Sequence, residues 1–222
     1  MKKILFVSLI ALSLVMTGCK KDNKKALEFK EDYEELNGTT NSRGVEHRTI
    51  TISKDNKFVE VKPSEILKKI ENKETFYVYF GSRLCPWCRS VIEKADEISR
   101  NKKISKIYYV DVWDDQGVEI FRDKYEVIDK ELKQTFKGAK EYKKILNSID
   151  QNLLRDYVIT NSDGSTIEVG EKRIYAPNFV YFEKGKGIRL TNGKSEKQTD
   201  AREKLTKEML KDEEKVFNEF FK

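Results

Sequence analysis

Two cysteines separated by two residues, in the stretch Cys85-Pro86-Trp87-Cys88, have the types and spacing that thiol–disulfide chemistry needs. Thiols at this spacing are close enough to form a disulfide with each other. The deprotonated thiolate is the species that attacks another disulfide. The stretch therefore predicts a redox-active pair in which Cys85 is accessible and reacts first.

The residues on either side predict how the two thiols are positioned. An apolar, β-prone run at residues 75–80 precedes the motif. Apolar residues at helical spacing follow it: Val91, Ile92, Ala95 and Ile98. Cys85 is thus expected at the N-terminus of a helix, with Cys88 one turn further in. Unpaired backbone N–H groups and the helix dipole favour a thiolate there. Pro86 suits the first helical turn, where its missing N–H costs nothing.

Other uses of such a cysteine pair fit this chain less well. A closed zinc site needs a full tetrahedral ligand set, and the remaining candidates are Cys19 and His47. A structural disulfide across so short a loop would stabilise the fold little. A Cys–His nucleophile pair would have to use His47, far upstream on a polar stretch. We therefore expect neither a metal nor another cofactor.

A second landmark lies far along the chain, where Ala176-Pro177 precedes the apolar run 178–182. Together with the strand, Cys85-Pro86-Trp87-Cys88 and the helix, it resembles the thioredoxin fold. The resemblance covers roughly residues 45–222. It implies an α/β architecture with a central mixed sheet flanked by helices. It also implies a cis Ala176-Pro177 bond beside the cysteines, with the Ala176 backbone pairing with the substrate.

Within that superfamily, the chain is similar to thioredoxin-like membrane lipoproteins of low-GC Gram-positive bacteria and to bacteriocin-transport accessory proteins. It departs from the thioredoxin pattern at Tyr79, because thioredoxins carry a buried acid six residues before the first cysteine. The resemblance thus supplies no proton acceptor for Cys88. Arg83 and Arg89 flank the motif, and positive charge there would favour the Cys85 thiolate. The alternative, which has equal weight, is that each of these arginines is an ordinary surface charge.

The first nineteen residues have the features of a bacterial lipoprotein leader. Lys2 and Lys3 precede an apolar segment, 4–16, that is too short to span a bilayer comfortably. The segment leads into Met16-Thr17-Gly18-Cys19, which resembles a lipobox. Lipidation of Cys19 also accounts for the odd cysteine among the three of an exported protein.

We therefore expect a signal peptide at residues 1–18 and an acylated, palmitate-type anchor on Cys19. The anchor would hold the chain in the lipid membrane, at the extracytoplasmic face of the cell membrane. An ordinary leader or an uncleaved anchor is the alternative. The formal charge is +6, and the lysines and acidic residues are interspersed along the chain. No cluster of basic and aromatic residues indicates nucleic acid as a partner.

The chain of 222 residues, of which 38% are hydrophobic, allows one globular domain of ordinary size. Residues 19–44 are predicted to be a polar tether. Four of its apolar residues would suit a short helix that docks on the domain: Leu27, Phe29, Tyr33 and Leu36. The domain itself, 45–222, is expected to begin with strands at 49–52, 58–61, 75–80 and 104–112. Helices between them imply a parallel core.

Residues 117–157 are predicted to form a helical insertion ahead of the cis-proline strand. Apolar residues at steps of three and four suggest one amphipathic helix over 118–136 and a second over 142–153. The insertion would either cover the core or shape a substrate groove. A hairpin over 157–169, an antiparallel pair over 178–190 and a closing helix over 200–222 complete the expected elements.

These features predict an extracytoplasmic thiol–disulfide oxidoreductase that works through a mixed disulfide. Cys85 would attack and Cys88 would resolve, while Pro86 and Trp87 set access and redox poise. Ala176 and Pro177 would bind the substrate, as the resemblance implies. The expected partners are proteins with thiols or disulfides and a membrane redox protein that recycles the cysteines. The alternative is a non-catalytic thioredoxin-like accessory or scaffold protein of a membrane transport system.

Overall fold

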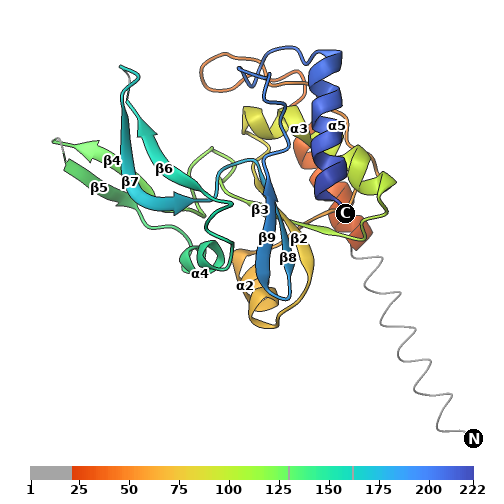
Figure 1. The fold of residues 1–222 in the computed structure, drawn as a ribbon. Coiled ribbons are helices and arrows are strands. Elements are labelled where there is room, and N and C mark those ends of the chain that lie inside the picture. Colours follow the sequence, from red (N-terminus) through yellow and green to blue (C-terminus); the bar gives the residue numbers. More distant parts are fainter. Residues whose placement is uncertain (1–21, 130, 162) are drawn as a thin grey trace, which may run out of the picture.

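A five-stranded mixed sheet lies at the centre of the fold (Figure 1). The structure is a computed structural model that describes residues 22–222 except residues 130 and 162. The strands, in spatial order, are β1 (Phe58–Glu60), β3 (Ile107–Asp111), β2 (Phe76–Gly81), β8 (Asn178–Glu183) and β9 (Lys186–Thr191). The first three run parallel, whereas β8 and β9 run antiparallel to their neighbours. The prediction of an α/β fold with a mixed central sheet is confirmed.

Two apolar clusters cover the two faces of this sheet. On one face, α3 (Pro86–Asn101) packs against α5 (Lys207–Phe220). On the other, α2 (Pro63–Glu71) packs against α4 (Tyr142–Asn147). Strand β2 supplies Tyr79 to the first cluster and Val78 and Phe80 to the second. Because a strand directs alternate side chains to opposite faces, this apolar run is buried on both sides.

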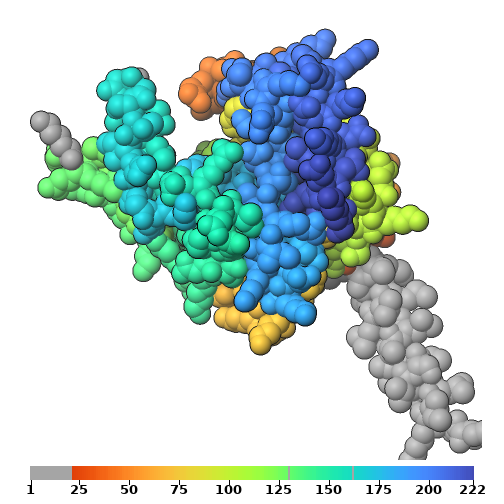
Figure 2. Space-filling model, in the orientation of Figure 1, coloured from red at the N-terminus to blue at the C-terminus, as the bar shows by residue number. Residues whose placement is uncertain are grey.

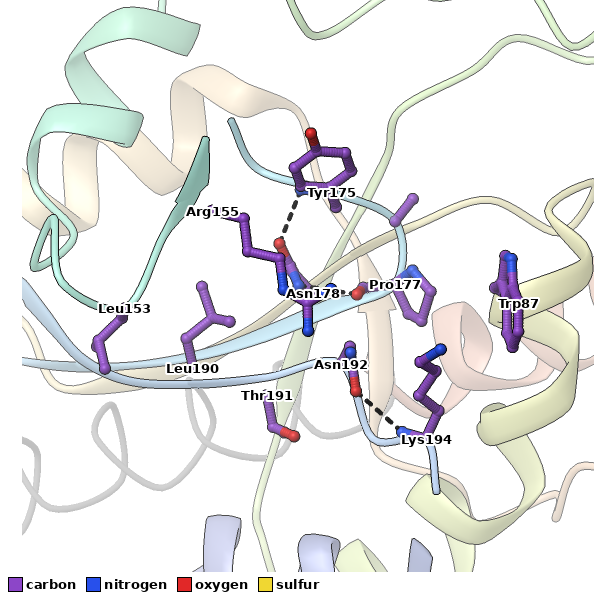
Figure 3. Close-up of a pocket in the computed structure, with 11 residues that line it drawn as sticks. Trp87, Leu153, Arg155, Tyr175, Pro177, Asn178, Leu190, Thr191, Asn192 and Lys194 are labelled. Carbon is purple, nitrogen blue, oxygen red and sulfur yellow. Dashed lines mark hydrogen bonds between the residues drawn. The ribbon is translucent and has the colours of Figure 1, made fainter. Parts of the chain in front are cut away.

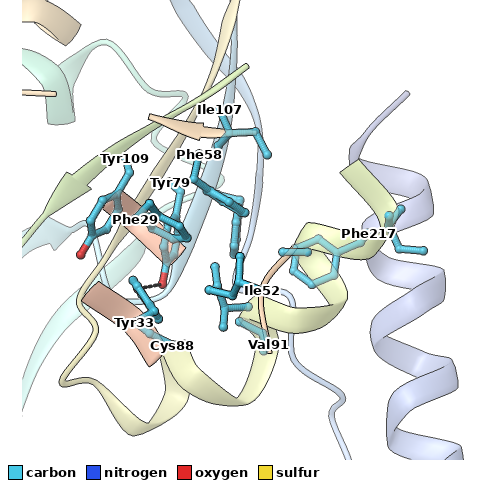
Figure 4. Packing of buried hydrophobic residues seen from close by; sticks show 14 of the residues in the cluster. Phe29, Tyr33, Ile52, Phe58, Tyr79, Cys88, Val91, Ile107, Tyr109 and Phe217 are labelled. Carbon is cyan, nitrogen blue, oxygen red and sulfur yellow. Dashed lines mark hydrogen bonds between the residues drawn. The ribbon is translucent and has the colours of Figure 1, made fainter. Parts of the chain in front are cut away.

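The core already includes residues 22–34, which form a helix. Phe29 and Tyr33 of this helix are buried, and the Phe29 ring stacks on Phe58 with centroids 4.6 Å apart (Figure 4). The prediction of a tether is therefore wrong for residues 22–34, where the docking helix considered as an option is present, whereas residues 37–44 lie in turns and loop. The expected signal peptide and Cys19 lie outside the described residues.

The strand expected over residues 49–52 is also absent from the described structure, although Ile50 and Ile52 are buried. Side chains, rather than a neighbouring strand, accept from its backbone N–H groups. Ile50 N donates to Asn37 Oδ1 at 3.1 Å, and Ile52 N donates to Glu34 Oε1. These backbone N–H groups are therefore satisfied without pairing to another strand. The alternation of apolar residues reflects the packing of an irregular segment against the core.

The helical insertion predicted over 117–157 is wrong. Residues 124–136 form an antiparallel hairpin of β4 (Lys124–Ile128) and β5 (Glu131–Phe136), and α4 covers only six residues. Asp129, which follows β4 directly, has a left-handed φ of 54° that ends the strand. Valine, isoleucine and threonine in these strands also favour extended backbone over helix.

A second hairpin, β6 (Arg155–Thr160) with β7 (Thr166–Arg173), confirms the hairpin expected after the insertion. The two hairpins extend from the same side of the central sheet, at the left of Figures 1 and 2. The predicted antiparallel pair near the C-terminus is β8 and β9, and the closing helix begins at Lys207 rather than near residue 200. No helix within the described part of the chain is long and apolar enough to cross a membrane.

Candidate active site

The cysteine motif lies where β2 turns into α3, as the sequence predicts. Cys85 is the N-cap residue of α3, with an extended backbone at φ −78° and ψ 118°, and Pro86 occupies the first helical position. The Cys85 carbonyl accepts from Arg89 N at 3.0 Å, which closes the first helical turn. Cys88 lies inside that turn, so the two thiols have different surroundings.

Both thiols are free and both are buried. Cys85 is 4% exposed and Cys88 is 0% exposed, so Cys85 is the more accessible thiol by a small margin only. The open access expected for Cys85 is therefore not observed. The loop that covers it carries Ala176, whose carbonyl oxygen accepts from Cys85 Sγ at 3.6 Å.

The loop at Ala176 and Pro177 reaches the cysteines because of strand pairing. Strand β8 runs antiparallel to β2, with Asn178 opposite Phe80, so the residues that precede β8 meet the residues that follow β2. The Ala176–Pro177 peptide bond is cis. The structure thus brings together Cys85, Ala176 and Pro177, which the sequence places about ninety residues apart.

Asn178 is a site residue that the sequence analysis did not single out. Its Oδ1 accepts from Tyr175 N at 2.7 Å, and its Nδ2 donates to the Pro177 carbonyl at 2.9 Å (Figure 3). These bonds hold the loop on both sides of Ala176. The sequence signal for this role is the position of an asparagine directly after Pro177.

The pKa values of the two thiols are shifted in opposite directions. A hydrogen bond from Cys88 lowers the pKa of Cys85, and the backbone N–H groups of Cys88 and Trp87 at the helix end add to this effect, against the opposing effect of burial. Burial raises the pKa of Cys88 well above its ordinary value, and the Cys85 thiolate raises it further. Cys85 is therefore the thiol of the pair that ionises more readily, and Cys88 the one that keeps its proton to higher pH.

The arginines that flank the motif are bonded to groups other than the thiols. Arg89 is 1% exposed and donates to the carbonyls of Tyr33 (2.7 Å) and Arg48 (2.9 Å), so it joins α3 to the N-terminal segment. Arg83 is ion-paired with Glu35 and with Asp115, the latter at 3.0 Å. Neither guanidinium is among the main causes of the lowered pKa of Cys85.

The cation that does lower the pKa of Cys85 is Arg122. Its side chain is buried, pairs with Glu119 and donates to the Ile174 carbonyl at 3.3 Å. Arg122 lies in the segment that the sequence predicts as an amphipathic helix. No sequence signal connects it to the cysteines, because only the tertiary fold brings the two together.

Tyr79 lies six residues before Cys85, on the strand that leads into the cysteine motif. Its hydroxyl is 2.9 Å from the hydroxyl of Tyr33, and both side chains are fully buried (Figure 4). Tyr79 acts on Cys88 as a hydrogen-bonding neighbour and lowers its pKa, partly opposing the effect of burial. The site therefore contains a pair of tyrosine hydroxyls beside the buried thiol. One of them comes from the helix at residues 22–34.

A groove of about 420 Å³ runs beside the motif, between Trp87 and the loop of Pro177 (Figure 3). Residues after β9 form its other side, including Asn192 and Lys194. The ammonium of Lys194 lies 4.2 Å from the centroid of the Trp87 ring. The groove gives a ligand access to the loop that contacts Cys85.

No group of three or more His, Cys, Asp or Glu side chains is suitably placed to hold a metal ion in the range that the structure covers, 22–222 without residues 130 and 162. The chemistry that the arrangement can perform is that of the thiol pair itself. No protein-family model matches the chain, and no curated protein sequence matches it.

Proposed function

We propose that this protein is a thiol–disulfide oxidoreductase with a thioredoxin-like fold. One observation carries the proposal: a thiolate-favouring cysteine, Cys85, lies at the N-terminus of α3 and contacts the carbonyl of Ala176 at 3.6 Å, next to the cis Pro177. The opposite pKa shifts of Cys85 and Cys88 support it, because exchange requires one thiolate and one protonated thiol.

The thioredoxin-like fold is supported by the strand order β1-β3-β2-β8-β9 and by helices on both faces of the sheet. The cysteine motif follows the central strand β2, and the proline loop precedes the neighbouring antiparallel strand. The two hairpins at 124–173 stand between the third strand and that loop.

The reaction begins when the Cys85 thiolate attacks one sulfur of a substrate disulfide. A Cys85–substrate S–S bond forms, the substrate S–S bond breaks, and the leaving sulfur takes up a proton. Cys88 then loses its proton and attacks the Cys85 sulfur. The Cys85–Cys88 disulfide forms and the second substrate thiol leaves, so two electrons pass from the cysteine pair to the substrate. The same steps in reverse oxidise a substrate dithiol.

The substrate would lie against the loop at Ala176. A backbone segment in extended conformation can pair with main-chain groups at such a position, as in strand addition. Trp87 and Pro86 border the approach to Cys85 and are only partly buried. A membrane redox protein that recycles the cysteine pair completes the cycle.

The location follows from the leader sequence. Lipidation of Cys19 after removal of residues 1–18 would anchor the protein at the extracytoplasmic face of the cell membrane. Disulfide exchange is a reaction of such oxidising compartments.

Burial of Cys85 to 4% exposure is the observation that favours a second candidate, a non-catalytic thioredoxin-like scaffold or accessory protein of a membrane transport system. Turnover of a test disulfide by the purified protein separates the two. An oxidoreductase exchanges the disulfide, and Cys85→Ala reduces the rate to background. A scaffold shows the background rate with or without Cys85.

Trapping of the intermediate provides the second part of this experiment. Cys88→Ala removes the resolving thiol, so mixed disulfides on Cys85 should accumulate as high-mass adducts on non-reducing gels and vanish with reductant. Cys85→Ala is the matched control and should give none. Equal adducts from both variants would show that the roles of the two cysteines are wrongly assigned.

A further inference from the structure

The groove beside Trp87 and Pro177 is lined by positive charge and by no negative charge. Its lining includes Arg155 and Lys194 but neither Asp nor Glu. Lys194 lies over the Trp87 ring, 4.2 Å from its centroid, so one positive charge is directly at the cysteine motif. Figure 3 shows Lys194 on the Trp87 side of Pro177, and Arg155 beyond Asn178. The two cations thus flank the proline loop.

Both cations are available to a ligand. Within the described residues, no carboxylate forms an ion pair with Arg155 or Lys194. Asp156, the neighbour of Arg155, is paired with Lys172 at 2.9 Å. Two carboxylates near the Lys194 loop, Glu208 and Asp212, are paired with Lys197, and Glu196 in that loop is exposed and does not line the groove. An unpaired cation facing a cavity attracts anions and repels cations at little desolvation cost.

The shape of the groove suits part of a polypeptide. Its volume of about 420 Å³ holds several side chains rather than a single ion. Its lining includes Ala176 and Asn178 of the proline loop and the polar residues Thr191 and Asn192. A peptide that placed its disulfide at Cys85 would extend along this groove, past both cations.

We infer that the preferred substrates are proteins whose exchanging cysteine is flanked by Asp or Glu, with the acidic side chains bound by Lys194 and Arg155. The inference rests on the proposed oxidoreductase function, since it names the substrate class of the same site. Selection occurs through charge in the groove, while the chemistry at Cys85 is the same for every disulfide.

Binding without turnover tests the groove directly. Three peptides would carry serine in place of the cysteines, with Asp/Glu, Gln/Asn or Lys/Arg at the flanking positions. Fluorescence of Trp87 reports binding in a Trp113→Phe background, because the chain has two tryptophans. The acidic peptide should bind about tenfold more tightly than the neutral one at low salt, and the difference should shrink as salt rises.

The double variant Arg155→Gln/Lys194→Gln should bring the acidic-to-neutral affinity ratio close to one. Lys186→Gln/Lys211→Gln changes the net charge equally at exposed positions outside the groove and should keep the ratio of the parent protein. Equal binding of all three peptides by the parent, or loss of preference in both double variants, would overturn the inference.

The disulfide forms of the same peptides separate this inference from the proposed function. Exchange that is fastest with the acidic disulfide supports both. Exchange at equal rates for all three contradicts the inference and leaves the function standing. Selective binding of the acidic serine peptide without exchange of any disulfide supports the groove assignment and contradicts the oxidoreductase function.

Discussion

Cys85 and Cys88 differ because of their positions in a single helical turn. Cys85 occupies the N-cap position, where the Cys88 thiol and the backbone N–H groups of the first turn lower its pKa, whereas Cys88 is enclosed by the core. The lowered pKa of Cys85 means that its thiolate persists to lower pH than that of an ordinary cysteine. Cys88 stays protonated to higher pH, because burial raises its pKa.

Alkylation across a pH series should therefore modify Cys85 first, and at low pH almost exclusively. Mass mapping of the modified peptides measures the order. In denaturant the two thiols should react alike, since the helix end and the burial are lost. Preferential labelling of native Cys88 at low pH would contradict the assignment.

Tyr79 is the residue that helps Cys88 lose its proton. Its hydroxyl lowers the pKa of Cys88 and is held by the hydroxyl of Tyr33. Tyr79→Phe keeps the ring, which stacks on Phe179 with centroids 4.5 Å apart, and removes only the hydroxyl. Resolution of the mixed disulfide should slow about threefold to tenfold, which corresponds to one lost hydrogen bond. Rapid-quench analysis of a single turnover measures this step.

Tyr181→Phe is the matched control for that variant, because Tyr181 is partly buried on a neighbouring strand and its ring packs against Tyr77 with centroids 4.8 Å apart. Its resolution rate should equal that of the parent. A Tyr79→Phe protein that resolves as fast as the parent would mean that the Tyr79 hydroxyl does not promote the ionisation of Cys88.

At the scale of elements, α5 carries a carboxyl group whose environment makes its packing depend on pH. Glu213 is fully buried in this helix, and neither of its side-chain oxygens has a hydrogen-bond partner among the described residues. Burial raises the pKa of Glu213 from 4.5 to about 8, although the charges of Arg48 and Lys94 oppose the shift. The helix is therefore best accommodated with Glu213 protonated.

The sign of the resulting pH dependence follows from proton release. Below pH 4.5 both the folded and the unfolded chain hold the Glu213 proton, whereas between pH 4.5 and about 8 only the folded chain holds it. The free energy of unfolding should thus fall as pH rises through this range, by several kcal/mol, on the order of 5. Urea titrations at pH 5, 6.5 and 8 measure this fall.

Glu213→Gln should remove most of this pH dependence, since the amide cannot ionise. The adjacent Glu214 is exposed, so Glu214→Gln should behave like the parent. A Glu213→Gln protein with an unchanged slope of stability against pH would show that other groups cause the effect.

The elements that could be predicted from sequence are those with a buried face. Helix α3 was predictable because its apolar residues repeat at helical spacing, and β2 and β8 because each is a short continuous apolar run, as strands buried on both faces are. The hairpin at 124–136 was not, since β5 is almost entirely exposed and its pattern reports no packing. The three-residue spacing of apolar residues such as Tyr125 and Ile128 matched that of a helix by coincidence.

The same limit applies to the candidate site. The motif Cys85-Pro86-Trp87-Cys88 and the proline loop could be recognised from residue types and order. Arg122 and Tyr33 could not. The charge of Arg122 acts on Cys85 and the hydroxyl of Tyr33 contacts Tyr79, and only the tertiary fold places these two residues near the motif.

At the scale of the whole molecule, the leader sequence predicts how the protein is attached. Cys19→Ser should release the protein from the membrane fraction or leave the leader uncleaved, because acylation requires the thiol. Cell fractionation and the mass of the N-terminal peptide measure both outcomes. Cys85→Ser, the matched control, should remain anchored. A processed, membrane-bound Cys19→Ser product would mean that another feature anchors the chain.

The helix at residues 22–34 packs in the core, so the folded domain begins only three residues after Cys19. Three residues of fully extended chain span at most about 11 Å. A free tether of twenty-five residues would instead have given an average reach of roughly 25–30 Å. A lipid on Cys19 would therefore hold the first helix of the domain next to the bilayer surface. The reach of the cysteine pair would then be set by the folded domain, so the protein would meet disulfides in membrane proteins, or in chains emerging from a translocation channel, more readily than those diffusing farther out.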